Sequence, residues 1–149
     1  MQPMARGYRF EVAVSFADED RDYVRQVVEA LHREGVSVFY DVDHEVELWG
    51  RDLVADLDRV YRFDSEFVVI FVSRHYVRKQ WTRHELRSAL ARAIRERREY
   101  VLPARFDDSD VPGLPPTVRH VSCRGPKQPD GLTPDELAAT ICRKLGRTP

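Results

Sequence analysis

The first segment with a regular hydrophobic pattern covers residues 8–16, where side-chain character alternates with a period of two. The alternation separates two sets of side chains: Phe10, Val12, Val14 and Phe16 on one face, Glu11, Ala13 and Ser15 on the other. Period two is the repeat of a β-strand, so this segment predicts a strand. From Arg21 the spacing becomes helical, with apolar residues at Val24, Val27, Val28 and Leu31. Gly35 then marks the expected end of an amphipathic helix.

Strand and helix patterns continue to alternate along the chain. Further strands are expected at residues 36–41, 66–73, 100–106 and 118–123, and further helices at residues 51–62, 73–94 and 134–145. The run FVVIFV within 66–73 is continuously apolar, which is typical of a central strand buried on both faces. Pro103 indicates that its strand lies nearer an edge or carries a bulge. Thr133 to Glu136 has the pattern of a capping box, with proline at the first helical position.

This order of elements predicts an α/β fold with right-handed crossovers. We expect a flavodoxin-like three-layer sandwich: a five-stranded parallel sheet with helices on both faces. The whole chain, 1–149, is expected to form one domain, with 1–7 as a flexible arm. Ligands of such sheets bind at the carboxyl ends of the strands, where the strand order reverses. The loops at that edge are residues 16–20, 41–50, 73–81, 106–117 and 123–131.

Charge and composition narrow the classes of protein. The net charge is −1, from 24 basic and 25 acidic residues, so the whole chain attracts no particular partner. Residues 74–98, however, hold nine basic and two acidic residues. No apolar run reaches the ~20 residues of a membrane span, and the first residues have no apolar signal region, so we expect a cytoplasmic protein without membrane contact. Cys123 and Cys142 have no metal-binding spacing, and we expect no metal site.

The stretch from Ser73 to Leu90 carries the candidate chemistry, because it holds one carboxylate, Glu85, among basic and aromatic residues. In a continuous helix Trp81 and Glu85 share a face. Four cations surround them in sequence: Arg78, Lys79, Arg83 and Arg87. Such a face suits an anionic ligand with an aromatic base. The alternative is that Trp81 belongs to the core and Glu85 is a solvated helix residue.

Several of these segments together resemble a Toll/interleukin-1 receptor (TIR) domain of bacterial type, from Phe10 to about Leu145. The matching segments, in order, are EVAVSFADED, LHREGVSVFYD, a loop ending in WG, VVIFVSRHYVRKQWTRHEL and YVLPARF. Their order and spacing carry the resemblance more than any one of them. Three positions depart from the family pattern: Glu11 for its opening Asp, Gln80 for the Ser before its Trp, and Thr82 for the Cys after it.

The resemblance implies an NAD+ hydrolase, with NAD+ as substrate and no cofactor. The family's catalytic glutamate falls on Glu85 and its helix tryptophan on Trp81. The implied reaction cleaves the nicotinamide–ribose bond through an oxocarbenium-like transition state. The product is ADP-ribose or a cyclic ADP-ribose isomer, and the sequence leaves this open. The resemblance also implies activation by self-association and a role in prokaryotic immune or stress signalling.

Further residues are candidates for the pocket. Ser15, Phe16 and Ala17 follow the first strand, and Ser73 follows the third, where it can bond a ligand oxygen or cap the backbone. Asp41 is a candidate ligand contact, although it can also simply cap or solvate its loop. Trp49 can stack on a base or gate entry, or equally anchor its loop or form a partner surface.

Other functions remain to be weighed against this one. A non-catalytic TIR adaptor would associate through the 41–50 loop and would not need Glu85. A receiver domain fails, because Ser73 stands where its phosphorylated Asp belongs. We do not expect nucleic-acid binding, since the arginines of residues 74–98 can face solvent. A dinucleotide-binding oxidoreductase lacks its GxGxxG segment.

Overall fold

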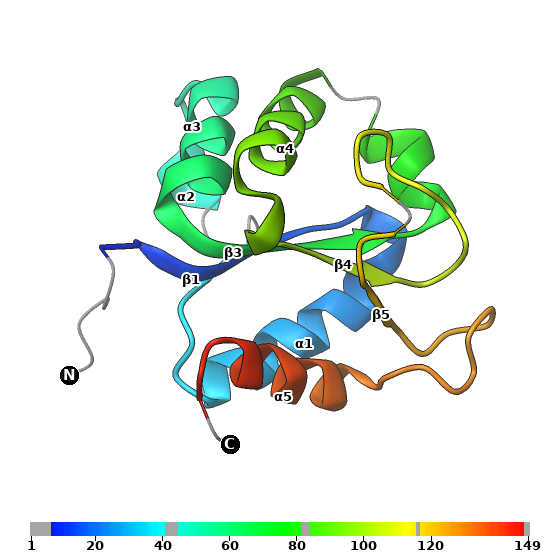
Figure 1. Cartoon of the computed structure of the whole chain (residues 1–149). Helices are drawn as coiled ribbons and strands as arrows, with labels where there is room; N and C mark the ends of the chain where they lie inside the picture. Colours follow the sequence, from blue (N-terminus) through cyan, green and yellow to red (C-terminus); the bar gives the residue numbers. More distant parts are fainter. Residues whose placement is uncertain (1–6, 41–44, 82–83, 116, 148–149) are drawn as a thin grey trace.

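The computed structural model describes residues 7–40, 45–81, 84–115 and 117–147 (Figure 1). Within these ranges, six residues are described by their backbone alone: Glu45, Leu53, Val54, Gln80, His84 and Glu85. The strands are β1 Phe10–Ser15, β2 Val38–Phe39, β3 Ser65–Val72, β4 Val101–Arg105 and β5 Val121–Ser122. The helices are α1 Arg21–Arg33, α2 Glu45–Leu48, α3 Leu53–Arg59, α4 His84–Arg97 and α5 Pro134–Lys144.

The five strands form one sheet in the order β2-β1-β3-β4-β5, with every neighbouring pair parallel. Helices α1 and α5 cover one face of the sheet, and α3 and α4 cover the other (Figure 1). This confirms the expected flavodoxin-like three-layer arrangement. Strand β3 lies at the centre, as its continuous apolar run predicts. No helix in the described ranges is long and apolar enough to span a bilayer.

Each face of the sheet has its own hydrophobic core, and β3 contributes to both. Val68, Ile70 and Val72 pack toward α3 and α4, whereas Val69 and Phe71 pack toward α1 and α5. Alternate side chains of a strand point to opposite faces, so a strand covered on both sides must be apolar throughout. Strand β1 differs in one detail from the expected pattern. Phe10 packs in the α3–α4 core, opposite to Val12, Val14 and Phe16.

The ends of α1 and α5 follow the expected signals. After α1, Gly35 has φ +75°, and the N–H of Val36 donates to the carbonyl of Leu31 at 3.0 Å. This left-handed turn satisfies carbonyls that the helix leaves without partners, and glycine adopts it without strain. At the start of α5, Thr133 and Glu136 exchange side-chain and backbone hydrogen bonds in a complete capping box. Both predicted boundaries are thus confirmed.

Three segments differ from the sequence-based expectation. The loop at 41–50 contains a short helix, α2. The helix expected at 51–62 is α-helical only to Arg59 and ends in a π-helical turn, Val60–Asp64. The helix expected at 73–94 is divided: a π-helical turn, Tyr76–Gln80, precedes α4. Hydrophobic spacing does not resolve these changes, because a π turn adds one residue without interrupting the apolar pattern.

Pro103 lies on β4, which has neighbours on both sides and is not an edge strand. Strand β5, however, pairs only with Ala104 and Arg105. Pro103 therefore faces β3 on one side and has no paired residue of β5 on the other. Strand β4 is second from the edge of the sheet, which agrees with the expectation of a strand nearer an edge, and the proline occupies the part of the strand where its missing N–H costs least.

Candidate active site

The strand order reverses between β1 and β3, which lie side by side in the middle of the sheet. From β1 the chain passes to α1 on one face, and from β3 it passes to α4 on the other (Figure 1). The two segments that leave these strands diverge at the carboxyl edge, which is where doubly wound sheets bind ligands. Most of the candidate residues follow these two strands or begin α4.

Hydrogen bonds join the segments after β1 and β3 directly. The hydroxyl of Ser73 donates to Oδ2 of Asp20 at 2.6 Å and accepts from the N–H of Tyr76 at 3.1 Å. Ser73 is 2% exposed, so both of its hydrogen-bonding functions are used inside the protein. Asp20 precedes α1 but its side chain does not cap the helix, because it turns to Ser73, and Asp18 pairs with Arg21.

Charged groups surround this contact. The ammonium of Lys79 pairs with Glu19, and the imidazole Nδ1 of His75 lies 3.9 Å from the same carboxylate. The hydrogen bond from Lys79 lowers the pKa of Glu19. Burial raises the pKa of Asp20, and the Ser73 hydroxyl offsets only part of that shift. The carboxylates of neighbouring residues 19 and 20 are therefore pushed in opposite directions.

Asp107, which follows β4, connects that strand to the segment after β3. Its Oδ2 accepts from the N–H of Arg74 at 2.9 Å, and its Oδ1 accepts from the N–H of Ser109 at 2.9 Å. Burial opposes the charged form of Asp107, but these hydrogen bonds outweigh it and lower its pKa. The segments after β1, β3 and β4 are thus held together by side chain to backbone and side chain to side chain contacts.

The three candidates at the end of β1 lie below the surface. Ser15 is 3% exposed, and its hydroxyl is 2.8 Å from the hydroxyl of the buried Tyr76. Phe16 stacks on Tyr40 with ring centroids 5.6 Å apart, and the guanidinium of Arg21 lies 4.9 Å from its ring. Ala17 is completely buried. Their side chains form the floor of the carboxyl edge rather than its surface.

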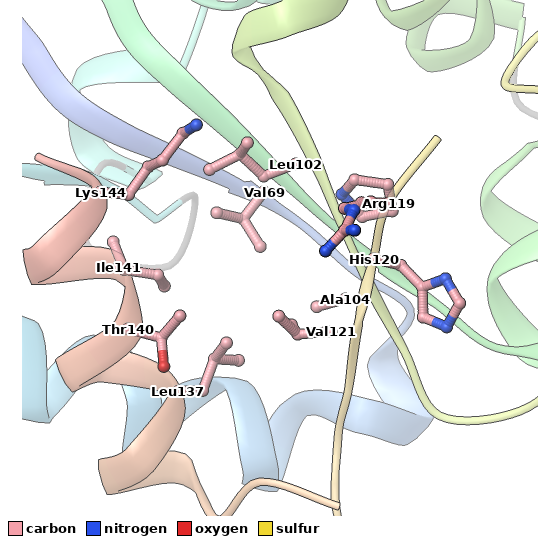
Figure 2. Close-up of a pocket in the computed structure, with 11 residues that line it drawn as sticks. Val69, Leu102, Ala104, Arg119, His120, Val121, Leu137, Thr140, Ile141 and Lys144 are labelled. Carbon is pink, nitrogen blue, oxygen red and sulfur yellow. The ribbon is translucent and has the colours of Figure 1, made fainter. Parts of the chain in front are cut away.

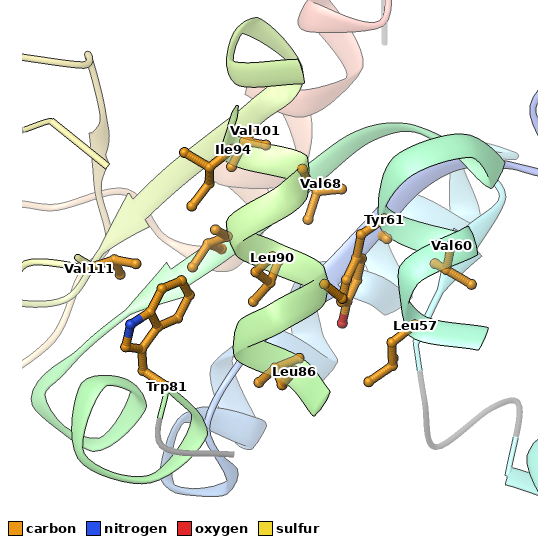
Figure 3. Packing of buried hydrophobic residues seen from close by; sticks show 14 of the residues in the cluster. Leu57, Val60, Tyr61, Val68, Trp81, Leu86, Leu90, Ile94, Val101 and Val111 are labelled. Carbon is orange, nitrogen blue, oxygen red and sulfur yellow. The ribbon is translucent and has the colours of Figure 1, made fainter. Parts of the chain in front are cut away.

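Trp81 packs in the core between α4 and the loop after β4, beside Val111 (Figure 3). It is 7% exposed. A stacking platform for a ligand needs an accessible ring face, and this placement matches the alternative in which Trp81 is a core residue. The reason lies in the π-helical turn before it, where the Trp81 N–H donates to the carbonyl of Tyr76 at 2.9 Å.

Glu85 is the second residue of α4, so its backbone lies at the start of a helix that follows β3. The dipole of the helix stabilises negative charge at this end. The side chain of Glu85 lies outside the described part of the chain, as do residues 82–83. The relation expected between Trp81 and Glu85 requires one continuous helix. The described helical segments instead end at Gln80 and begin again at His84.

The loop after β2 contributes one exposed aromatic ring. Trp49 is 87% exposed at the end of α2, and Val46 on the same short helix is 84% exposed. Asp41 lies outside the described residues. The following segment is anchored by Arg51, whose guanidinium makes two hydrogen bonds, of 2.8 and 2.9 Å, to the buried carboxylate of Asp56.

Sequence reasoning missed Asp20, Tyr76 and Asp56 as residues that shape this edge. Each is held by a partner that is distant in sequence or across a turn, which periodicity alone does not reveal. A buried polar group must be paired, but the partners of Asp20 and Tyr76 follow from the packing of β1 against β3. The one usable signal was the position of Asp20 at the end of the loop between the first strand and the first helix.

Two pockets formed by described residues lie away from this edge. One, of about 300 Å³, lies between β4, β5 and α5, and the other, of about 250 Å³, lies between α4 and residues 112–113. Among the described residues, no group of three His, Cys, Asp or Glu side chains is placed to hold a metal ion.

The fold and this edge define a doubly wound α/β domain whose candidate ligand site is at the β1–β3 switch point. Solved structures with the same fold include the TIR domain of the Toll-related receptor TRR-2 from Hydra magnipapillata. That similarity has a TM-score of 0.61 at 15% identity, over 76% of this chain and 83% of the other. The model of the TIR domain family matches residues 12–137. The chain belongs to the TIR domain family.

Characterised relatives cover much of the chain. It is 44% identical over 140 residues to the 3′ cyclic ADP-D-ribose synthase AaTIR of Aquimarina amphilecti, which is 94% of this chain and 41% of that protein. It is 32% identical over 95 residues to the NAD(+) hydrolase TcpC of Escherichia coli, over 63% of this chain and 30% of the other. The 2′ cyclic ADP-D-ribose synthase AbTIR of Acinetobacter baumannii is 31% identical over 86 residues, 57% of this chain and 31% of that protein. The chain thus spans less than half the length of these relatives.

Proposed function

We propose that this chain cleaves the nicotinamide–ribose bond of NAD+ and that Glu85 is the catalytic carboxylate. One observation carries the proposal: a relative named as a 3′ cyclic ADP-D-ribose synthase is 44% identical over 94% of the chain. The position of Glu85 in the first turn of α4, at the edge where this fold binds ligands, supports its role. As the substrate is a dinucleotide of the cell interior, we place the reaction in the cytoplasm.

The chemistry explains why one carboxylate suffices. Nicotinamide is a cationic leaving group in NAD+, so it departs with the electron pair of the C1′–N bond and needs no proton. Positive charge then develops on the ribose, as in glycoside cleavage. A carboxylate beside C1′ stabilises that charge and holds the ribose hydroxyls. This reaction has no step that calls for a metal or a redox cofactor, and we propose that none is used.

The product depends on which nucleophile reaches C1′. Water gives ADP-ribose and releases a proton, whereas a hydroxyl oxygen of the same molecule gives a cyclic isomer, also with loss of a proton. We propose cyclisation at the 3′ position as the main outcome, because the relative that matches 94% of this chain carries that name. Other relatives are named as 2′ cyclic ADP-D-ribose synthases or NAD(+) hydrolases, so the product differs among the relatives of this chain.

The residues around Glu85 have supporting roles in this proposal. The hydrogen bond between Ser73 and Asp20 fixes the distance between the segments after β1 and β3. The hydrogen bond between Ser15 and Tyr76 adds a second connection between the same two parts of the chain. Trp81 packs beneath α4 and orients its first turn. We propose Asp41 and the backbone of Phe16 and Ala17 as further contacts of the substrate. Trp49, being exposed, is available to close over the substrate.

We further propose that self-association regulates the enzyme. Val46 and Trp49 expose two large apolar side chains on one short segment, 84% and 87% accessible. Exposed apolar groups that lie together mark interaction surfaces on proteins. A second copy that covers them would hold the segment of Val46 and Trp49 in one position beside the substrate, and activity would then rise with protein concentration.

A non-catalytic adaptor remains the second candidate, because the same exposed pair would serve a partner without any chemistry. The two functions differ in one measurement: nicotinamide release from NAD+ by the purified chain at high protein concentration, with and without a crowding surface. Glu85→Gln removes the charge and retains the shape. Glu99→Gln is the matched control, since Glu99 is an exposed glutamate just after α4.

We expect nicotinamide release from the wild type and from Glu99→Gln, and a loss of at least about 100-fold in Glu85→Gln, the size of effect typical for one charge-stabilising group. Chromatography of the second product separates ADP-ribose from its cyclic isomers. Equal turnover in all three proteins would remove Glu85 from the active site. No turnover in the folded, clustered wild type would support the adaptor.

A further inference from the structure

A pocket of about 300 Å³ lies between β4, β5 and α5. None of the described candidate active-site residues lines it. The pocket exists because β5 pairs only with Ala104 and Arg105, so the first half of β4 has a strand on its β3 side but none on its β5 side. Helix α5 spans this gap without filling it (Figure 2). The pocket is therefore a consequence of the short last strand, and it is separate from the carboxyl ends of β1 and β3.

Its walls are apolar and its rim is basic. The walls come from both the sheet and the helix: Leu102, Ala104, Val121, Leu137 and Ile141. Arg119 extends over the pocket from the segment before β5, and Lys144 stands at the end of α5 (Figure 2). No described residue that lines the pocket carries a carboxylate. An apolar interior with cations at its mouth complements a small molecule that has an apolar body and one negative charge.

The two cations are not equivalent. Lys144 is the last residue of α5, where the helix carbonyls repel an anion, and its ammonium lies 5.8 Å from the ring of Phe67. Arg119 is an exposed residue outside any helix, and the structure gives its guanidinium no ion pair within the described ranges. An arginine fork binds a carboxylate through two hydrogen bonds. Arg119 is therefore the better anchor for the charge.

We propose that this pocket binds a small amphipathic carboxylate, with its apolar chain between α5 and β4 and its carboxylate on Arg119. The volume lies at the lower end of the range for small-molecule sites, about 300 to 1,000 Å³, so the occupant is of medium-chain size. The site is distinct from the NAD+ site and does not rest on the proposed enzymatic function.

The experiment uses octanoate as the probe, with octanol as its uncharged counterpart. Amide chemical shifts of the labelled chain are followed while each is added. We expect octanoate to shift resonances of β4, β5 and α5, with a dissociation constant of about 1 mM or lower, and octanol to bind at least about fivefold more weakly. Arg119→Gln should weaken octanoate at least about fivefold. Lys127→Gln, an exposed lysine in the loop after β5, is the matched control and should not.

A second variant tests the apolar half of the site. Thr140 is half-buried and lines the pocket, so Thr140→Phe fills it and should abolish binding of both probes. Equal affinity for octanoate and octanol, or no effect of Arg119→Gln in a folded protein, would overturn the proposal. Shifts confined to other regions would do the same. The octanoate-induced shifts could also vanish as the protein concentration rises while sedimentation shows dimers. That result would mean that a second copy of the chain covers the pocket, and it would overturn the proposal.

Discussion

The hydroxyl of Ser73 lies 2.6 Å from Oδ2 of Asp20, although 53 residues separate them in the chain. This hydrogen bond joins the segments that leave β1 and β3 at the point where the sheet changes direction. Asp20 is half-buried and Ser73 is fully buried, so water does not replace the contact when it is lost. The shape of the candidate active site therefore depends on a pair that is local only in the folded protein.

We predict that Ser73→Ala lowers the free energy of unfolding by about 1 to 3 kcal/mol, because it leaves a half-buried carboxylate and a backbone N–H without their partner. Chemical denaturation measures the loss. Asp22→Asn serves as the control, since Asp22 pairs with Arg25 on the exposed side of α1 and should change stability by less than about 0.5 kcal/mol. Equal effects of the two substitutions would contradict the role assigned to Ser73.

The free energy of unfolding of Asp20→Asn should depend on pH differently from that of the wild type. The asparagine oxygen still accepts from Ser73, and it carries no charge. Burial raises the folded-state pKa of Asp20 above its ordinary value of 3.8. Its titration therefore favours the folded state at acid pH, and this contribution is lost as pH rises through the folded pKa. Relative to wild type, Asp20→Asn should gain stability between about pH 3 and pH 7. A constant difference across this range would exclude a raised pKa.

Asp56 should show the opposite dependence. The hydrogen bond from Arg51, with help from Arg59, lowers the pKa of Asp56, although burial opposes the charge. This contribution is present above the ordinary aspartate value of 3.8 and is lost as pH falls through the folded-state pKa. Asp56→Asn should destabilise the protein by about 1 to 3 kcal/mol at pH 7 and by less near pH 3, where the unfolded chain is already largely protonated. Urea titrations at the two pH values measure this, and a larger loss at acid pH would be evidence against the ion pair.

The two tryptophans should be spectroscopically distinct. Trp81 is 7% exposed and Trp49 is 87% exposed. The Trp49→Phe variant should keep blue-shifted emission that acrylamide quenches poorly, and Trp81→Phe should keep red-shifted emission that it quenches strongly. In a Trp49→Phe, Glu85→Gln protein, NAD+ should quench the remaining emission only weakly. Strong, saturable quenching would mean that Trp81 stacks on the substrate rather than supporting α4.

Two glycines offer a matched test of the β5–α5 connection. A Cβ on Gly131 would lie 2.5 Å from the carbonyl carbon of Cys123 and 2.6 Å from the N of Arg124, both backbone atoms. At Gly125 the nearest atom, in the Phe106 ring, is 3.8 Å away. Gly131→Ala should therefore lower stability by about 2 kcal/mol or more, since the backbone must move, and Gly125→Ala should change it little. Similar melting temperatures for both variants would contradict this difference.

Much of the architecture could be predicted from local pattern. The apolar run of β3, the helical spacing of α1, Gly35 and the capping box at Thr133 all depend on neighbours in sequence, and the structure agrees with each. Because strands and helices alternate along the chain and crossovers are right-handed, only a few sheet topologies are possible. The family resemblance rests on the same short segments and is confirmed.

The sequence by itself determined the fold class, the family and the position of Glu85 within its motif, because these depend on periodicity and on residues close together in the chain. Only the tertiary structure decided what surrounds that motif. It placed Trp81 in the core, joined Ser73 to Asp20, and left the beginning of β4 open beneath α5. These outcomes follow from packing between segments far apart in sequence, and from π-helical turns that change the direction of a side chain without changing the hydrophobic pattern.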